Sequence, residues 1–138
     1  MNYTELVQLY FERSNALQSY WTLYVVIVGG VLAFSSLRKQ PAALTTAIVS
    51  VLFALFAYEN LSAIQDTASQ RFATLDAIKK SEGTAAEVAR LRESLEPTLT
   101  PASHSSTRTT HLVSDVLTIA ALWAMELRRR KLHALPAA

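Results

Sequence analysis

Three ionisable residues of this chain lie in or next to apolar segments, where a charge is costly and is therefore a candidate for function. Glu59, His111 and Asp115 lie in or beside long apolar runs, and His111 precedes Asp115 by four residues, which places both on one face of a helix. Ionisable groups in such surroundings are costly and usually face a cavity or a charged partner. The favoured interpretation is structural: Asp115 pairs with His111 or caps its helix, and Glu59 reaches water. The alternative is an acidic pore mouth, repeated around an oligomer, that attracts cations or relays protons.

Other chemistry has little support in these 138 residues. His111, Asp115, Glu59 and His104 have suitable types for a metal site, but the His-x-x-x-Asp spacing alone is a weak signal. The chain has no cysteine, no Gly-rich phosphate loop and no HExxH motif, and the serines around His104 lie in an irregular segment. We expect a protein without enzymatic activity, and with no catalytic residue, metal or cofactor.

The elements that must position these residues are apolar. Two uncharged runs, Ser14–Leu37 and Gln40–Tyr58, are separated only by Arg38 and Lys39. Each is long enough to cross a bilayer, which takes about 20 mostly apolar residues. A third run, Leu112–Leu127, has its acids near its ends, and its apolar residues surround the helix, which favours a span over a helix lying on the membrane surface. The sequence predicts an all-α integral membrane protein with three transmembrane helices.

The runs divide the chain into seven predicted segments. They are an N-terminal amphipathic interfacial helix over 1–17, transmembrane helices over 18–37, 42–60 and 111–128, an extramembrane helical hairpin over 61–96 between the second and third spans, a Ser/Thr/Pro connector over 97–110, and a basic C-terminal tail over 129–138.

Glycine and proline positions define the hairpin. Neither residue type occurs from 42 to 82, so the second transmembrane helix should continue to about residue 80. Gly83 should end it, and Thr84 with Glu87 forms a capping-box pattern that starts a second helix over 85–95. We expect Val88, Leu91 and Leu95 to face back onto the first helix of the hairpin.

Basic residues set the predicted orientation. The segment 62–109 contains six basic and six acidic residues and carries no bias, whereas two basic groups fall on one side of a three-span protein. They are Arg38, Lys39, Arg128, Arg129, Arg130 and Lys131, which we interpret as topology anchors near lipid headgroups. Glu126 should pair with Arg129 and Arg130 on its own helix. We expect a multi-pass protein of a cell membrane, most simply the bacterial inner membrane, with the N-terminus outside and the C-terminus cytoplasmic. No nucleic-acid partner is expected, because the basic cluster lacks aromatic residues.

Small residues recur at intervals of three or four along the spans, and such ridges let helices approach closely in lipid. Those that we assign to helix packing are Gly29, Ala33, Ala47, Ser50, Ala54 and Ala121. Packing within one chain is one explanation. A homo-oligomer is favoured, because three helices bury few of these faces.

Two functions fit this layout. The first is a small oligomeric scaffold or partner-sensing assembly in the bilayer, with a protein partner bound through residues 61–96. The alternative is an oligomeric cation channel or membrane-permeabilising pore with acids at its mouth. Three spans with an outside N-terminus and a basic C-terminus resemble class I phage holins in topology, although the inserted hairpin departs from that layout.

Overall fold

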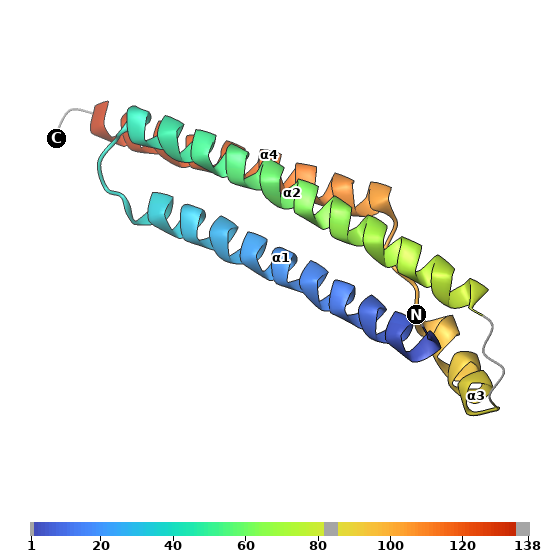
Figure 1. Ribbon diagram of the computed structural model, residues 1–138. Helices are drawn as coiled ribbons and strands as arrows, with labels where there is room; N and C mark the ends of the chain where they lie inside the picture. Colours follow the sequence, from blue (N-terminus) through green and yellow to red (C-terminus); the bar gives the residue numbers. More distant parts are fainter. Residues whose placement is uncertain (1, 82–85, 135–138) are drawn as a thin grey trace.

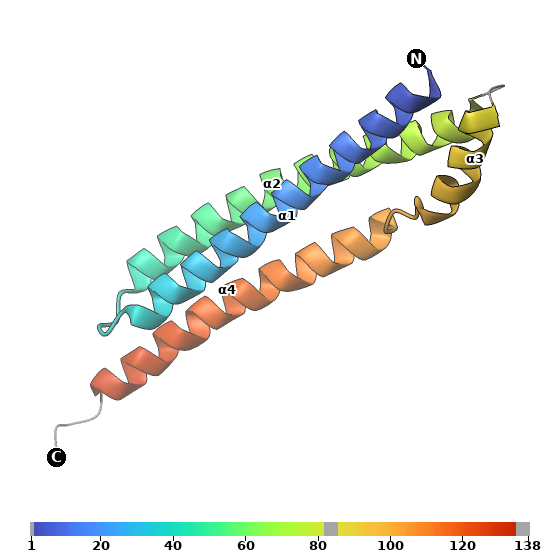
Figure 2. The same ribbon diagram turned by 90° about the horizontal axis from the view of Figure 1, so that it is seen from below.

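The computed structural model describes residues 2–81 and 86–134, apart from the side chains of residues 86 and 87. Every element in these two ranges is helical: α1 is Tyr3–Leu37, α2 is Ala43–Lys80, α3 is Ala86–Leu95, a short 3-10 turn is Glu96–Thr98, and α4 is His104–Ala134. The helices α1 and α2 form a long antiparallel hairpin, and α4 lies along both of them (Figures 1 and 2). α3 lies at the far end from the α1–α2 turn (Figure 1).

The three long helices are each long and apolar enough to cross a membrane. In the apolar stretch of each, only 11% of α1, 28% of α2 and 22% of α4 is buried inside the chain. Most of the large apolar side chains there point away from the bundle; Val25, Leu44, Val51 and Val116 are each more than half exposed. A water-soluble bundle would bury such side chains, because each one left in water forfeits about 1.5 to 3 kcal/mol of transfer free energy.

Helix α1 is continuous from Tyr3 to Leu37, which corrects the predicted interfacial helix over residues 1–17. It begins with a capping box, in which Asn2 accepts from the Glu5 amide at 2.8 Å and the Asn2 amide donates to Glu5 Oε2 at 2.9 Å. The amphipathic face of its first turns packs on protein. Tyr3, Leu6 and Tyr10 are buried with three residues from later segments: Leu75, Ile78 and Leu99. The extension of α2 offers this face an apolar partner, so the face is covered without a lipid surface.

Helix α2 runs unbroken to Lys80, in agreement with the single helix expected from the lack of glycine and proline. After it, Arg92 of α3 reaches back and donates to the carbonyl of Ile78 at 2.8 Å and to that of Ser81. A guanidinium group at this position adds donors to the carbonyls at the end of the helix and complements the negative end of its dipole.

Only part of the expected inward face of helix α3 packs against the rest of the bundle. Val88 packs against the cluster of Tyr3 and Ile78, but Leu91 is 41% exposed, so the predicted inward face of α3 is only partly right. The predicted stop at Gly83 and the N-cap at Thr84 lie outside the described residues.

Helix α4 starts at His104, so the predicted connector over 97–110 is too long, and it ends at Ala134, so residues 129–134 are helical and not a tail. The early start has a local cause. The Ser103 hydroxyl accepts from the Ser106 amide at 3.2 Å, which is the interaction of a serine N-cap. The serines and threonines that suggested an irregular segment thus include the residue that begins the helix.

Candidate functional site

Polar side chains gather on the inner faces of the long helices in two groups. The histidine cluster consists of Tyr24, Asn60, His111 and Asp115. The Glu126 cluster consists of Glu126, Arg38, Thr46, Arg129 and Arg130. Along α4, His111 and Arg129 are separated by about 27 Å at a rise of 1.5 Å per residue. Between the two clusters lie buried apolar side chains, among them Phe53, Ala57 and Leu122.

In the histidine cluster the polar groups form a continuous chain of hydrogen bonds. The Tyr24 hydroxyl donates to Asp115 Oδ1 at 2.8 Å, and His111 Nδ1 lies 2.9 Å from Asp115 Oδ2. His111 Nε2 lies 3.1 Å from Asn60 Oδ1, and the Asn60 amide group donates to the Tyr20 carbonyl at 3.2 Å. Both nitrogens of the imidazole therefore lie within hydrogen-bond distance of a side-chain oxygen. Residues of three helices are thereby tied at one level.

Aromatic rings cover this cluster. The His111 ring is fully buried, with the Tyr24 ring centroid at 4.2 Å and the Trp21 centroid at 5.6 Å. Tyr24 and Trp21 themselves meet edge to face at 5.9 Å. Excluding water strengthens each hydrogen bond in the cluster and raises the cost of leaving any of its polar groups without a partner. The arrangement holds helices together and leaves its central histidine enclosed.

The structure separates the residues of the hypothetical acidic mouth. His111 and Asp115 pair with each other, which is the structural interpretation favoured from the sequence, while Glu59 is exposed on α2 and takes no part in the cluster. His104 lies apart, with its ring 4.7 Å from that of Phe72. Within residues 2–81 and 86–134, no three His, Asp or Glu side chains come close enough together to hold a metal ion.

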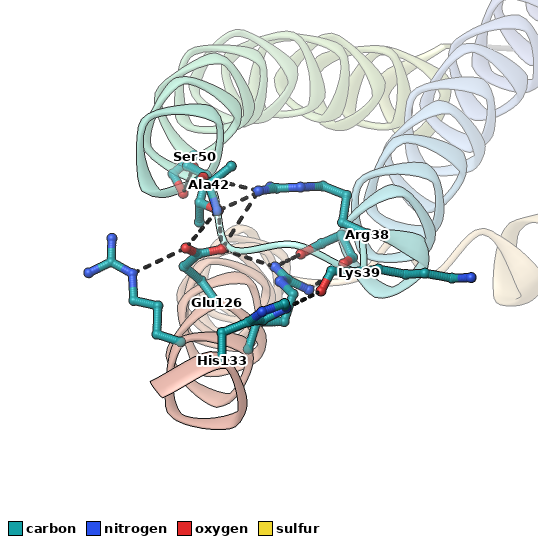
Figure 3. A network of polar contacts seen from close by, with 10 residues as sticks. Arg38, Lys39, Ala42, Ser50, Glu126 and His133 are labelled. Carbon is teal, nitrogen blue, oxygen red and sulfur yellow. Dashed lines mark hydrogen bonds and ion pairs between the residues drawn. The ribbon is translucent and has the colours of Figure 1, made fainter. Parts of the chain in front are cut away.

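The second cluster is built around Glu126, whose side chain is completely buried (Figure 3). Its carboxylate accepts from the Ala42 amide at 2.9 Å and from the Thr46 hydroxyl at 3.3 Å. Three guanidinium groups surround the same carboxylate: Arg130 at 3.2 Å, Arg129 at 3.3 Å and Arg38 at 3.7 Å. Four hydrogen-bond donors and the guanidinium of Arg38, from three segments of the chain, therefore meet on one acid.

The geometry of this cluster follows the polarity of two helix ends. Ala42 is the N-cap of α2 and has no side chain able to cap it, so Glu126 supplies a carboxylate at the positive end of that helix. Arg129 donates to the Ser35 carbonyl at 2.7 Å in the last turns of α1, the negative end of that helix. An acid and a base three residues apart on α4 thus match the two opposite helix ends beside the α1–α2 turn.

Three of the six predicted lipid-facing residues, Arg38, Arg129 and Arg130, belong to this cluster, and two of them are turned inward. Arg129 is only 8% exposed, and the Arg38 side chain is only 15% exposed and donates to Thr46 and to the Ala42 carbonyl. Their inward direction follows from the buried carboxylate of Glu126 and, for Arg129, from the Ser35 carbonyl in the last turns of α1. The other four, Lys39, Arg128, Arg130 and Lys131, are exposed. The expected pairing of Glu126 with Arg129 and Arg130 is present, but it is the centre of a larger network.

Sequence reasoning missed Asn60, Thr46 and Tyr24 as members of the clusters. Asn60 carried a signal, since a polar amide stood at the end of an apolar run beside Glu59. Glu59 was selected as the candidate because it is charged, whereas the buried residue of the two is Asn60, which is 5% exposed. Tyr24 was assigned only to a membrane boundary, and its hydroxyl instead meets Asp115, 91 positions further along the chain.

The small residues assigned to helix packing divide into inner and outer sets. Ser50 is buried and Ala47 and Ala121 are half-buried, whereas Gly29, Ala33 and Ala54 are exposed. A Cβ atom added at Gly29 would meet no atom within 4 Å, so this glycine serves no close approach inside the chain.

Comparison with protein-family models, with curated proteins and with solved structures finds no match to this chain.

Proposed function

We propose that this chain is an integral membrane protein without enzymatic activity. Its three long helices form a rigid platform, and the end of the bundle that carries α3, away from the α1–α2 turn, is presented to a partner. One observation carries the proposal. From His111 to Arg129 the two polar clusters together span about 27 Å along α4, close to the roughly 30 Å of a bilayer's hydrocarbon layer, and the outer surface of the helices over this length is apolar and exposed. Polar groups gathered inside at both boundaries, with apolar groups outside between them, are what a lipid solvent requires.

The use made of the acids supports a platform over a pore. Asp115 accepts from Tyr24 and His111, and Glu126 accepts four hydrogen bonds and forms an ion pair with Arg38, so both acids of α4 are engaged in holding helices together. A pore would need polar groups facing a shared conduit. Glu59, the third residue of the hypothetical mouth, is exposed on α2 and joins neither cluster.

The exposed sides of the bundle support two further parts of this proposal. The outer small residues Gly29, Ala33 and Ala54 offer a face through which a second copy packs, since nothing within the chain occupies the space at Gly29. The basic groups beside the α1–α2 turn and along the end of α4 favour a cytoplasmic location for that end. The end that carries α3 then lies outside and is the partner-binding end.

The absence of cysteine in the chain makes substituted-cysteine labelling a clean test of membrane insertion and sidedness. Three exposed positions serve: Gln40→Cys in the turn, Val51→Cys in the apolar middle, and Ser69→Cys in the extension of α2. With a membrane-impermeant maleimide added to cells, Ser69→Cys should react at once, Gln40→Cys only after the cells are opened, and Val51→Cys in neither case. Rapid labelling of Val51→Cys in opened cells would refute the transmembrane arrangement.

Ion flux separates the platform from the pore. In proteoliposomes loaded with a cation indicator, the full chain and Asp115→Asn should both remain tight, and Glu59→Gln is the matched control with an exposed acid. A cation current that changes with Asp115→Asn but not with Glu59→Gln would replace the platform by the pore.

The mass of the detergent-extracted particle tests the homo-oligomer, with Gly29→Leu as the disruptive variant. A monomer in the unmodified protein would contradict the homo-oligomer.

A further inference from the structure

The basic end of the bundle has more positive charge than its own acid can neutralise. Within the Glu126 cluster a single carboxylate faces the guanidinium groups of Arg38, Arg129 and Arg130. Lys39, Arg128 and Lys131 add three exposed charges at the same end, and in the described part of the chain none of them forms an ion pair. This excess of positive charge would be neutralised by an anion from outside the chain.

An open cavity of about 290 Å³ lies beside this charge, between the last turn of α1 and the end of α4. It is lined by Ser36, Arg38, Met125, Arg128, Arg129 and Leu132. Three of the six residues carry a guanidinium group, the group that matches a phosphate best because of its planar set of donors. Met125 and Leu132 form an apolar part of the same cavity. The lining is thus amphipathic, as the boundary between a lipid headgroup and its chains is.

Arg129 has hydrogen-bonding capacity to spare at this place. Its two terminal nitrogens contact Ser35 and Glu126, but its buried Nε has no partner among the described residues. Arg128, by contrast, is exposed. Arg129 is therefore held in place by the bundle, while Arg128 is exposed at the cavity and able to contact a bound group. Two guanidinium groups lining one cavity favour a localised anion site over a diffuse field.

We propose that this cavity binds the phosphate headgroup of an anionic phospholipid, with Arg128 contacting the phosphate, Arg38 and Arg129 adding positive charge to the cavity wall, and Met125 and Leu132 contacting the first carbons of the chains. The inference rests on the proposed membrane insertion, since the cavity lies at the level of lipid headgroups only if the helices cross a bilayer. It assigns to three arginines at this end a specific ligand in place of a general attraction to the membrane surface.

Native mass spectrometry of the full chain in a neutral detergent tests the site, with equal amounts of phosphatidylglycerol and phosphatidylcholine added. The unmodified protein should retain phosphatidylglycerol preferentially. Arg128→Gln should lower that retention about fivefold, the effect of one basic group near a lipid phosphate. Lys131→Gln removes an equal, exposed charge three residues away but outside the cavity, and should lower it less than twofold. Equal losses in the two variants would mean a diffuse field and would overturn the proposal.

A second variant changes shape without changing charge. Ser36→Leu fills the cavity and should also reduce phosphatidylglycerol retention, whereas Ser19→Leu, at an exposed serine far along the same helix, should not. Retention unaffected by Ser36→Leu would overturn the site.

A further arm separates the lipid from a free anion. If an excess of inorganic phosphate displaced the lipid, the cavity would be a site for free phosphate and not for a lipid. If phosphatidylglycerol retention were unchanged in Arg128→Gln while Val51→Cys stayed protected from labelling, this inference alone would be refuted. Rapid labelling of Val51→Cys would instead refute the membrane insertion on which the inference rests.

Discussion

At one end of the bundle α4 is held by charge, and at the other it is held by aromatic rings and a chain of hydrogen bonds. The difference follows from where helices end. Beside Glu126 both α1 and α2 terminate, so backbone groups of opposite polarity are free and an acid and a base on α4 can bind them. At His111 both helices continue past the cluster, so no backbone amide is free and side chains must satisfy one another.

The two clusters together fix the position of α4 along the hairpin. Sliding α4 by one turn would separate His111 from Asn60 and Glu126 from Ala42 at the same time, and each group would be left buried without a partner. Apolar packing in lipid is much less selective, because lipid chains are as apolar as the side chains. The polar clusters therefore set the register, and the apolar middle fills the space between them.

Loss of the charge at Glu126 should have the largest effect. Glu126→Gln keeps the size of the side chain and an acceptor for Ala42, but it leaves Arg38 and Arg129 buried without a carboxylate. Among the variants discussed here it should lower the unfolding temperature in detergent the most, as followed by circular dichroism. Glu59→Gln is the matched control at an exposed acid. If the two variants unfolded at the same temperature, charge would not be what holds this end.

Removal of the imidazole should have an intermediate effect. His111→Ala leaves Asp115 and Asn60 with unmet hydrogen bonds beneath an aromatic cover, which should cost about 2 kcal/mol. A chemical unfolding curve in mixed micelles measures this loss. In a Trp123→Phe background, the emission of Trp21, whose ring is 5.6 Å from that of His111, should shift to longer wavelength.

The control for that variant is His104→Ala, because His104 is exposed and its ring lies against Phe72 alone among the aromatic side chains described. It should leave both the unfolding curve and the Trp21 emission unchanged. A loss of stability in His104→Ala equal to that in His111→Ala would show that the buried hydrogen bonds are not the cause.

The smallest effects come from the same substitution made at two buried tyrosines. Tyr24→Phe removes the hydrogen bond to Asp115 and should cost about 1 kcal/mol. Tyr3→Phe should change stability by less than about 0.5 kcal/mol, because its hydroxyl has no hydrogen-bond partner among the described residues. Unfolding measured in parallel decides: equal losses would mean that ring packing, and not the hydrogen bond, accounts for the effect at Tyr24.

Tyr3 adds a dependence on pH to this pair. Burial raises the pKa of its phenol, and the Glu96 carboxylate raises it further, while Arg92 acts in the opposite direction. A group whose pKa is higher in the folded chain stabilises the fold below its unfolded pKa of about 10 and loses that contribution as the pH rises above it. The unmodified protein should therefore lose more stability than Tyr3→Phe between about pH 9 and about pH 11. Parallel pH profiles would contradict this.

The helices themselves could be predicted well from the residues. The lack of glycine and proline after residue 42 gave the continuous α2, and the length and composition of the apolar runs gave three helices able to cross a membrane. The start of α4 was predicted too late, because serines and threonines near His104 have two opposite meanings: they are common in irregular segments, and they also begin helices.

The site was harder to predict, because its partners are far apart along the chain. The pairing of His111 with Asp115 is local and was foreseeable from a spacing of four. That Tyr24 and Asn60 complete the same cluster depends on the relative rotation of three helices, which a single sequence does not reveal. Arg129 illustrates the same limit: its type and place suggested lipid, and a buried carboxylate with a free carbonyl drew it inward.

What the residues determined alone is the number of long helices and that three of them are long and apolar enough to cross a membrane, because apolar length and helix-breaking residues act locally. Tertiary structure decided which polar groups meet, and with them the register of α4, since hydrogen bonds and ion pairs depend on positions in space that are separated by up to 94 positions in the sequence. The physical reason is that local energies shape each helix, whereas the cost of an unpaired buried polar group is settled only between helices.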